Sequence, residues 1–368
     1  MTLKRIVRWG AGAISLALLT AVLVAYFTSS NECDSRTAPR GDLMRAIVQC
    51  DYGSPDALKL ENVEKPVPDD DELLIRVRAA SVNPLDWHYL RGTPYVARMN
   101  MGLRKPKSTR RGVDFAGTVE SVGKNVTQFK PGDEVFGGRG GAFAEYLSVR
   151  ADRAVVPKPA NVSFEQAAAV PVAGLTALQA LRDKGMVQPG QRVLINGASG
   201  GVGTFAVQIA KAFGAHVTGV CSTRNVDMVR SIGADRVIDY TREDFTRGAE
   251  RYDLILDNVG NHSLLACRRA LNPNGKYVLI GGGPPGRWFD PLPRALNAFL
   301  LSRLVSQDMG LMIAKLNKKD LAVLGELMQA GKVTPVVDRR YRLIEVPEAV
   351  RYVEGGHARA KVIITLDQ

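Results

Sequence analysis

The sequence contains little cysteine. Only four of its 368 residues are cysteines, they lie far apart, and no two of them form a Cys-x-x-Cys pair. Such spacing supports neither a disulfide framework nor a structural zinc lobe. For Cys33, Cys50, Cys221 and Cys267 we therefore expect a reducing compartment.

Signatures of nucleic-acid binding are also missing. The net charge is +12, from 49 basic and 37 acidic residues, but the basic residues are dispersed. No helix-turn-helix, zinc-finger or RNA-binding aromatic motif accompanies them. We therefore expect no nucleic-acid partner, and the charge is better explained by a phosphorylated cofactor or an anionic lipid surface.

Acidic residues are absent before Glu32, and an uncharged run extends from Trp9 to Phe27. As a helix, these nineteen residues would be roughly 28 Å long, close to the ~30 Å hydrocarbon thickness of a bilayer. We interpret residues 1–43 as a single-pass membrane anchor and linker. A cleaved signal peptide and a mitochondrial targeting segment are the alternatives. The basic residues on the two sides of the run balance, so charge does not determine the orientation.

The remaining chain is long enough for two domains. Short strand patterns occur at 45–50, 72–80, 117–122 and 141–149 and predict a β-rich domain over residues 44–168. Strands then alternate with helices, which predicts a doubly wound parallel sheet over residues 169–309. Short strands return between Tyr341 and Leu366, so we expect residues 310–368 to complete the first domain.

A glycine-rich turn lies between the first strand and helix of the α/β domain. Glycines at 197, 200 and 203 follow the apolar strand Arg192–Asn196 and precede a helix predicted over Gly201–Phe213. This order is typical of a dinucleotide-binding loop, in which free N–H groups at the helix start attract a pyrophosphate. A purely structural glycine turn is the alternative.

The end of the next strand discriminates between the two nicotinamide cofactors. A carboxylate there would accept the ribose 2′-OH and repel a 2′-phosphate. The chain instead has Cys221-Ser222-Thr223-Arg224, two hydroxyls and a guanidinium. This composition favours NADPH.

These motifs occur together with four others, in residues 83–86, 112–117, 130–135 and 356–361. In this order they resemble the quinone oxidoreductase branch of the medium-chain dehydrogenase/reductase superfamily. The resemblance runs from about Met44 to the C-terminus and is strongest to the reticulon-4-interacting-protein and alkenal/quinone reductase-like members. It implies a Rossmann domain inserted into a GroES-like catalytic domain, with the active site between them, and a possible homodimer.

The resemblance also implies roles for individual residues. Ser199, Gly200, Gly201, Val202 and Gly203 would line the pyrophosphate; Ser222, Thr223, Arg224 and Lys361 would surround the 2′-phosphate; Tyr240 would flank the adenine; and Val259, Gly281 and Gly282 would lie along the nicotinamide. Zinc-dependent members of the superfamily have a ligand cysteine where this chain has Asn83, and a Gly-His-Glu ligand where it has Val113-Asp114. We therefore expect no metal.

Without a metal, the expected chemistry is hydride transfer from NADPH to a quinone or an α,β-unsaturated carbonyl, a small-molecule substrate. Asn83 would hydrogen-bond the substrate carbonyl or the cofactor ribose, and Asp86 would position that loop. Two alternatives remain: reduction of simple aldehydes and ketones, or an NADPH-binding membrane-associated scaffold or redox sensor without turnover. Because NADPH is kept inside cells, we expect the catalytic domain to face the cytoplasm or an equivalent interior compartment.

Two further segments carry expectations. The loop from Arg98 to Arg111 holds six basic residues and no acidic one, and we expect it to rest on anionic headgroups or to be a solvated loop. The apolar stretch from Trp288 to Leu316 would shape substrate access or a subunit contact.

Overall fold

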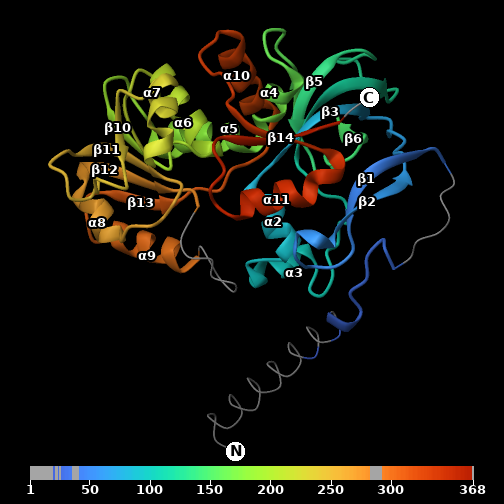
Figure 1. The fold of residues 1–368 in the computed structure, drawn as a ribbon, viewed down its shortest axis with the longest axis horizontal. Helices are drawn as coiled ribbons and strands as arrows, with labels where there is room; N and C mark the ends of the chain where they lie inside the picture. The colour runs from blue at the N-terminus through green and yellow to red at the C-terminus, as the bar shows by residue number, and fades with distance from the viewer. Residues whose placement is uncertain (1–19, 21–23, 25, 35–40, 282–291, 367–368) are drawn as a thin grey trace, which may run out of the picture.

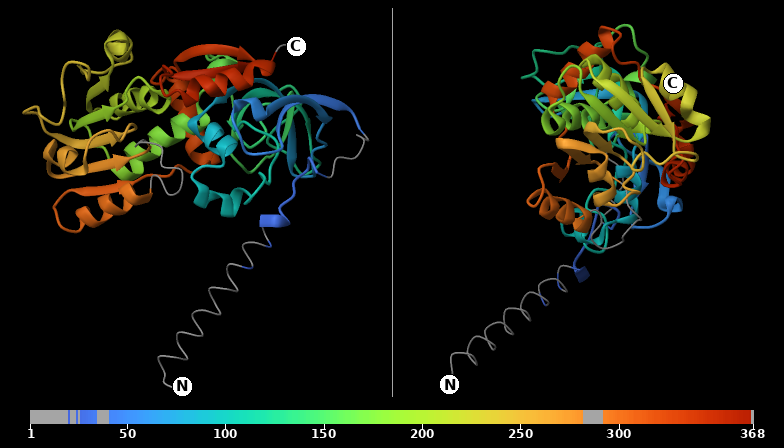
Figure 2. Two further views of the ribbon diagram at one scale, coloured as in Figure 1. Left: turned by 60° about the horizontal axis from the view of Figure 1, so that its bottom comes forward. Right: turned by 90° about the vertical axis from the view of Figure 1, so that its left-hand side faces the viewer.

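The computed structural model describes residues 20, 24, 26–34, 41–281 and 292–366 (Figure 1). Two lobes lie side by side (Figures 1 and 2). The first lobe contains residues from both ends of the described chain. The second lobe is formed by the middle of the chain.

The first lobe is built on a seven-stranded sheet in the order β14-β15-β3-β4-β5-β7, with β6 paired to β3. A separate antiparallel hairpin, β1–β2, lies beside it. The strands are β1 (Leu43–Gln49), β2 (Leu58–Glu64), β3 (Glu72–Val82), β4 (Asp114–Val122), β5 (Glu134–Gly138), β6 (Tyr146–Arg150), β7 (Val155–Pro157), β14 (Val337–Arg342) and β15 (Lys361–Thr365). Because β15 pairs with β3, the C-terminal segment completes the sheet begun near the N-terminus, as expected.

The second lobe is built on a six-stranded, entirely parallel sheet in the order β10-β9-β8-β11-β12-β13. Its strands are β8 (Arg192–Asn196), β9 (His216–Cys221), β10 (Arg236–Asp239), β11 (Tyr252–Asp257), β12 (Leu271–Leu279) and β13 (Asp308–Leu311). Its helices are α6 (Gly201–Ala212), α7 (Val226–Ser231), α8 (Leu264–Arg269) and α9 (Leu292–Ser302). This is the expected doubly wound sheet. Its last strand, β13, spans the boundary expected at residue 309.

Other helices lie in the first lobe and between the lobes. They are α2 (Pro84–Arg91), α3 (Arg98–Met101), α4 (Phe164–Ala168), α5 (Pro171–Gln179), α10 (Lys318–Gln329) and α11 (Val346–Glu354). Short helical turns are η1 (Pro55–Ala57), η2 (Tyr95–Ala97), η3 (Ala180–Gly185), η4 (Thr223–Asn225) and η5 (Leu343–Glu345). Helix α11 falls where only strands were expected. The helix forms because apolar residues recur there at the helical spacing i, i+3, i+4, i+7, as Val346, Ala349, Val350 and Val353.

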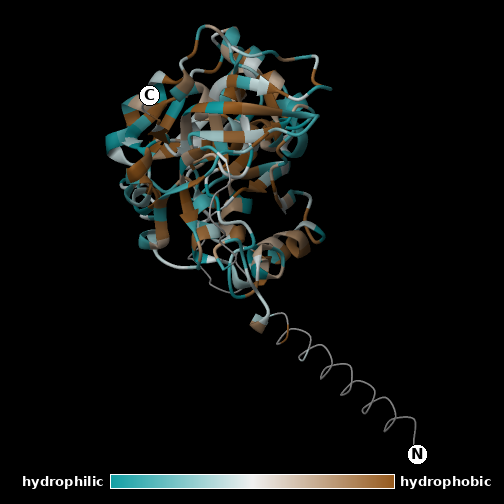
Figure 3. Cartoon of the chain, turned by 90° about the vertical axis from the view of Figure 1, so that its right-hand side faces the viewer, coloured by the Kyte–Doolittle hydropathy of each residue, from teal (hydrophilic) through white to brown (hydrophobic). Residues whose placement is uncertain are grey.

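The parallel strands are apolar because helices cover both faces of the sheet. In β8, Val193, Leu194 and Ile195 are fully buried, and Leu194 packs in a different cluster from the other two. Hydrophobic and hydrophilic segments intersperse along the elements of both lobes (Figure 3). Because β8 is buried on both faces, it gives the glycine-rich turn that follows it a rigid support.

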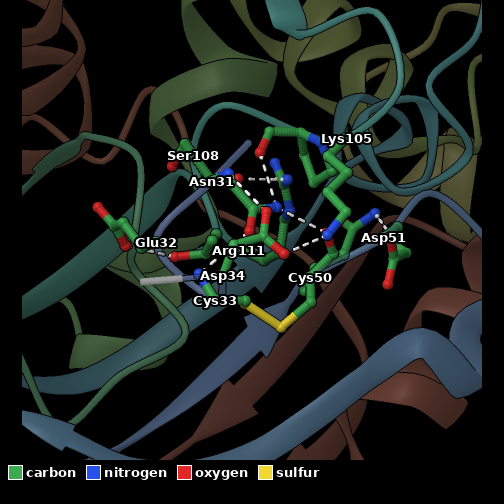
Figure 4. Close-up of a disulfide and its surroundings, with 12 residues drawn as sticks. Asn31, Glu32, Cys33, Asp34, Cys50, Asp51, Lys105, Ser108 and Arg111 are labelled. Carbon is green, nitrogen blue, oxygen red and sulfur yellow. Dashed lines mark hydrogen bonds and ion pairs between the residues drawn. A yellow bond between two sulfur atoms is a disulfide. The ribbon is translucent and has the colours of Figure 1, made fainter. Parts of the chain in front are cut away.

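The N-terminal region corrects one expectation. Cys33 and Cys50 form a disulfide, with their Cα atoms 5.7 Å apart (Figure 4). The pair forms because the segment 31–34 folds back onto the end of β1, where the Asn31 amide donates to Cys50 O at 2.6 Å. This disulfide corrects the expectation that the spacing of the cysteines supports no disulfide framework, while Cys221 and Cys267 are buried and free.

Within the described ranges, no helix is both long and apolar enough to cross a bilayer. Most of the run from Trp9 to Phe27, on which the anchor was predicted, lies outside those ranges. The anchor therefore stays a prediction.

Candidate active site and nucleotide-binding loop

The glycine-rich turn connects β8 to α6 in the second lobe. Gly197 has a φ of +78°, which favours glycine. A Cβ atom on Gly203 would lie 2.1 Å from Gly197 O, so only glycine lets α6 begin this close to the strand. The N–H groups at the start of α6 therefore face a turn whose backbone a phosphate can approach, as a dinucleotide-binding loop requires.

The residues expected around the 2′-phosphate converge beside this turn. Ser222, Thr223 and Arg224 follow β9, which is the direct neighbour of β8 in the sheet. The Asn225 side chain donates to Ser199 Oγ at 3.1 Å and to Ser222 Oγ at 3.2 Å. Asn225 thus links the turn to the end of β9. We did not anticipate it, because an asparagine at a helix start usually caps that helix.

Asn225 also leaves an acceptor without a partner. Its Oδ1 atom is buried and has no hydrogen-bond partner among the residues that the structure describes. Buried polar atoms are rarely left so, which indicates that a donor belongs here. A ribose hydroxyl of a bound nucleotide would be such a donor.

Arg224 and Thr223 also make contacts outside the turn, and Thr223 Oγ1 lies 3.1 Å from Thr241 Oγ1. Arg224 is exposed, and its Nη2 donates to His357 O at 3.0 Å. Thr223 Oγ1 donates to Asp239 Oδ2 at 2.6 Å, which brings one carboxylate near this end of the sheet. The exposed side of the guanidinium leaves donors available for a phosphate.

The remaining expected nucleotide contacts lie at the same edge of the sheet. Tyr240 follows β10 and is exposed, and its N–H donates to Cys221 O at 3.0 Å. Val259 follows β11 and lies beside the glycine turn, since a Cβ on Gly197 would approach its Cγ2 atom to 2.8 Å. Gly281 follows β12, and Gly282 lies outside the described residues.

The loop that carries Val259 is held by Asp257, a residue that sequence reasoning missed. Its buried carboxylate accepts the N–H of Gly260 at 2.8 Å, the hydroxyl of Tyr277 at 2.6 Å and the amide of Asn196 at 2.9 Å. The signal available in the sequence was an aspartate as the last residue of a predicted parallel strand. Asp257 therefore positions the 258–260 loop at the edge where a nicotinamide would lie.

The predicted catalytic residues lie in the first lobe, at the start of α2. Asn83 N–H donates to Asp86 Oδ2 at 2.7 Å, and both side chains are buried. The Asn83 side-chain amide donates to Asp114 Oδ2 at 2.8 Å and accepts from Lys361 Nζ at 2.5 Å. We call Asn83, Asp86, Asp114 and Lys361 the buried polar cluster.

Sheet pairing brings this cluster together. Asp114 pairs with Ser81 across β3 and β4, and Val362, next to Lys361, pairs with Val82 across β15 and β3. Asn83, Asp114 and Lys361 are far apart in the chain, and this pairing brings them together at one end of β3. The backbone of Ala360 also donates to Ser199 O at 2.7 Å, which places the cluster directly beside the glycine turn.

Lys361 is not placed as expected. Its side chain is 3% exposed, and its ammonium lies 3.5 Å from Asp114 as well as next to Asn83. The residue of the C-terminal segment that contacts Arg224 is His357. The predicted role of Lys361 at the 2′-phosphate is therefore corrected, because the buried acceptors of Asn83 and Asp114 offset the burial of its charge.

Burial controls the charges in the cluster. It raises the pKa of Asp114, which Lys361 and the hydrogen bonds of Asn83 and Ser81 oppose. It lowers the pKa of Lys361, which the neighbouring carboxylates oppose. For Asp86, burial raises the pKa to about 7, against the hydrogen bond from Asn83 N–H. Asp86 can thus hold or release a proton near neutral pH.

A cavity of about 270 Å³ lies against the cluster. Asp86 and Tyr89 of α2 line it, together with Val113, Arg111 and Tyr52. It is large enough for a small organic molecule, although at the lower end of the usual range. One wall is the basic loop from Arg98 to Arg111.

This loop is less available to headgroups than expected. Arg98 stacks on Tyr52 and Tyr95 and donates to Gly92 O at 2.9 Å, Lys105 pairs with Asp34, and Arg111 is buried. Half of its six basic side chains are therefore used within the protein.

No group of three or more histidine, cysteine, aspartate or glutamate side chains in the described part of the chain is arranged to hold a metal ion. In the buried polar cluster, the ammonium of Lys361 stands beside Asn83 and Asp114. An amide, a carboxylate and an ammonium do not provide the thiolate and imidazole ligands of a catalytic zinc site. The residues of the buried polar cluster therefore do not fit a catalytic zinc ion.

Comparison with known proteins agrees with this architecture. Residues 69–160 match the alcohol dehydrogenase GroES-like domain family, and residues 232–364 match a family described as zinc-binding dehydrogenase.

Individual relatives match over most of their length. The 2-methylene-furan-3-one reductase of Solanum lycopersicum is 35% identical, over 87% of this chain and 79% of its own. The human mitochondrial NAD(P)H oxidoreductase RTN4IP1 is 34% identical, over 90% and 91%. The structure of the quinone oxidoreductase from Coxiella burnetii superposes with a TM-score of 0.78 at 31% identity, over 89% of this chain and all of its own. The chain therefore belongs to the medium-chain dehydrogenase/reductase superfamily, as an oxidoreductase of its quinone oxidoreductase group that uses a nicotinamide cofactor.

Proposed function

We propose that this protein is a zinc-independent, NADPH-dependent oxidoreductase that reduces quinones or α,β-unsaturated carbonyl compounds. The observation that carries the proposal is the position of the buried polar cluster, which touches the glycine turn through Ala360 and the cavity through Asp86. A nucleotide on the turn and a substrate in the cavity would meet beside Asn83. The names of the relatives, quinone and enone reductases among them, agree with this substrate class.

NADPH would bind with its pyrophosphate on the N–H groups of Gly201, Val202 and Gly203, and its 2′-phosphate beside Ser222 and Arg224. When bound, it supplies a hydride. Thr223 donates its hydroxyl hydrogen to Asp239 and so lowers the cost of having that carboxylate near a phosphate. Tyr240 would lie against the adenine, and Val259 and Gly281 along the nicotinamide.

The polar cluster would act on the substrate by position and by charge. The cation of Lys361, held against Asn83, favours negative charge that develops on a carbonyl oxygen nearby. Asp86 lines the cavity and carries a proton over part of the neutral pH range, so it can return a proton to the reduced product. A conjugated acceptor suits this site because its own π-system spreads the charge that a zinc ion would otherwise stabilise.

The location follows from two requirements. The enzyme needs NADPH, and the Cys33–Cys50 disulfide needs an environment in which disulfides persist. We place the catalytic domain in an interior compartment with its own NADPH and oxidising conditions, anchored to the membrane by residues 9–27. A homodimer would form along β13, an edge strand of the six-stranded sheet, beside the exposed Leu304 and Ile313.

The test is steady-state oxidation of NADPH and NADH by the full chain in mild detergent, with a quinone, an enone and a simple aldehyde as acceptors. The proposal predicts preferential NADPH oxidation with the two conjugated acceptors. Asn83→Ala should lower the turnover rate, whereas Asn125→Ala, a matched change at an exposed asparagine, should not. Tight NADPH binding without turnover on any acceptor would favour a scaffold or sensor, and equal rates with the simple aldehyde would favour a general carbonyl reductase.

A further inference from the structure

The cavity beside α2 is basic on one side. Lys107, Arg110 and Arg111 line it, and Asp86 is the one acidic side chain among its lining residues. Because burial raises the pKa of Asp86 to about 7, this carboxyl offsets little of the positive charge below neutral pH. An anionic group is therefore favoured inside.

Arg111 is the most unusual of the three basic residues. It is only 8% exposed, and its Nη2 donates to Ser108 O at 2.6 Å. Its Nε atom is buried without a hydrogen-bond partner among the described residues. A guanidinium stays charged even when burial lowers its pKa, as it does here, so the chain keeps a buried cation in the wall of the cavity.

Leaving a charged donor buried and unpaired is costly, and in native proteins such a donor usually has a function. Tyr52 and Tyr89 lie on the same cavity and add aromatic walls. The combination of a planar fork of donors with aromatic sides suits a carboxylate attached to an organic group.

The loop that carries Arg111 cannot readily swing out to solvent. Gly112 has a φ of +87°, and a Cβ there would lie 2.6 Å from the Phe143 ring, so the backbone beside Arg111 is tightly packed. On the other side, the segment 31–34 holds the loop. The Asn31 amide donates to Pro106 O at 3.2 Å. Lys105 forms an ion pair with Asp34, and the Thr109 hydroxyl donates to Glu32. Figure 4 shows Arg111 beside these contacts and the Cys33–Cys50 disulfide.

We propose that this cavity is a subsite for a carboxylate on the substrate, with Arg111 as the binding residue, so that the preferred substrates are conjugated carbonyl compounds that also carry a carboxylate. This inference rests on the proposed reductase function. It makes Arg111 a specificity-determining residue, separate from the groups that act on the reacting carbonyl.

The test compares 3-benzoylacrylate, a conjugated keto acid, with its methyl ester as acceptors for the full-length enzyme and NADPH. We expect kcat/KM to be about 10- to 100-fold higher for the acid, the usual effect of one charged hydrogen bond. Arg111→Leu should abolish this preference, and Arg111→Lys should restore part of it. Arg153→Leu removes the same charge from an exposed arginine outside the cavity and should preserve the preference.

A binding measurement separates this proposal from the reductase function. The saturated analogue, 3-benzoylpropionate, has no conjugated double bond to reduce, and calorimetry should show that it binds the wild type at least 10-fold more tightly than Arg111→Leu. Such binding without turnover of either acceptor would contradict the reductase function and support the subsite. Equal binding to both proteins, or an acid preference that survives Arg111→Leu, would overturn the subsite, as would tighter binding of phenylphosphonate than of the carboxylate.

Discussion

Asp86 should make the stability of this protein depend on pH in the opposite sense to a carboxylate whose pKa an ion pair lowers in the folded state. In the folded chain, burial raises its pKa from 3.8 to about 7. Between these two values the unfolded chain releases the proton while the folded chain keeps it, so the folded state binds more protons. Stability is then lost as the pH rises from about 4 through about 7, and no further loss follows above that range.

The magnitude follows from the width of that range. Three pH units at 1.36 kcal/mol each give about 4 kcal/mol of stability lost between pH 4 and pH 7. Asp86→Asn keeps an oxygen to accept the Asn83 N–H but cannot ionise. The variant should therefore match the wild type near pH 4 and exceed it by about 4 kcal/mol above pH 7.

Urea unfolding of both proteins at a series of pH values from 4 to 8 measures this difference. Asp227→Asn, at a fully exposed carboxylate, makes the same change of charge without burial and serves as the control. A difference between Asp86→Asn and wild type that stays constant with pH, or that grows toward acid pH, would refute the reasoning.

Three further predictions concern the nucleotide site and the disulfide. Gly203→Ala should abolish nucleotide binding in a fluorescence titration, because its Cβ would lie 2.1 Å from a backbone oxygen, whereas Gly140→Ala, which meets nothing within 4 Å, should bind normally. Arg224→Ala should weaken NADPH about 10- to 100-fold and leave NADH nearly unchanged, and an equal loss for both would contradict its role at the 2′-phosphate. Cys33→Ser should lower the free energy of unfolding by about 3 kcal/mol, given the 17-residue separation of the paired cysteines, and a reducing agent should then have no additional effect on the variant.

Much of the α/β domain could be predicted because its signals are local. The strands Arg192–Asn196 and His216–Cys221 have the predicted bounds, since each is an apolar run that ends at a turn. The helix predicted over Gly201–Phe213 ends one residue earlier, at Ala212. Ser199 and Ser222 lie together because neighbouring parallel strands end at the same edge of the sheet.

The features that could not be predicted depend on contacts between distant residues. Lys361 belongs to a recognisable motif, but its direction is decided by Asn83 and Asp114, which reach it only through sheet pairing. The partner of Cys33 is likewise decided by the fold of residues 31–34 onto β1, which the spacing of four cysteines does not reveal. The expected strand from Gly141 begins only at Tyr146, and β5 was not anticipated, because glycines at 137, 138, 140 and 141 obscure the alternating pattern there.

The central claim is hydride transfer from NADPH to a conjugated acceptor bound beside the buried polar cluster. The most direct measurement is the reduction of an enone by the full chain with NADPH that carries deuterium at both hydrogen positions of C4 of the nicotinamide, followed by mass and NMR analysis of the product. The account predicts deuterium at the β-carbon of the saturated ketone, at a rate that falls in Asn83→Ala. A saturated product without deuterium, or NADPH that is bound but never oxidised, would contradict it.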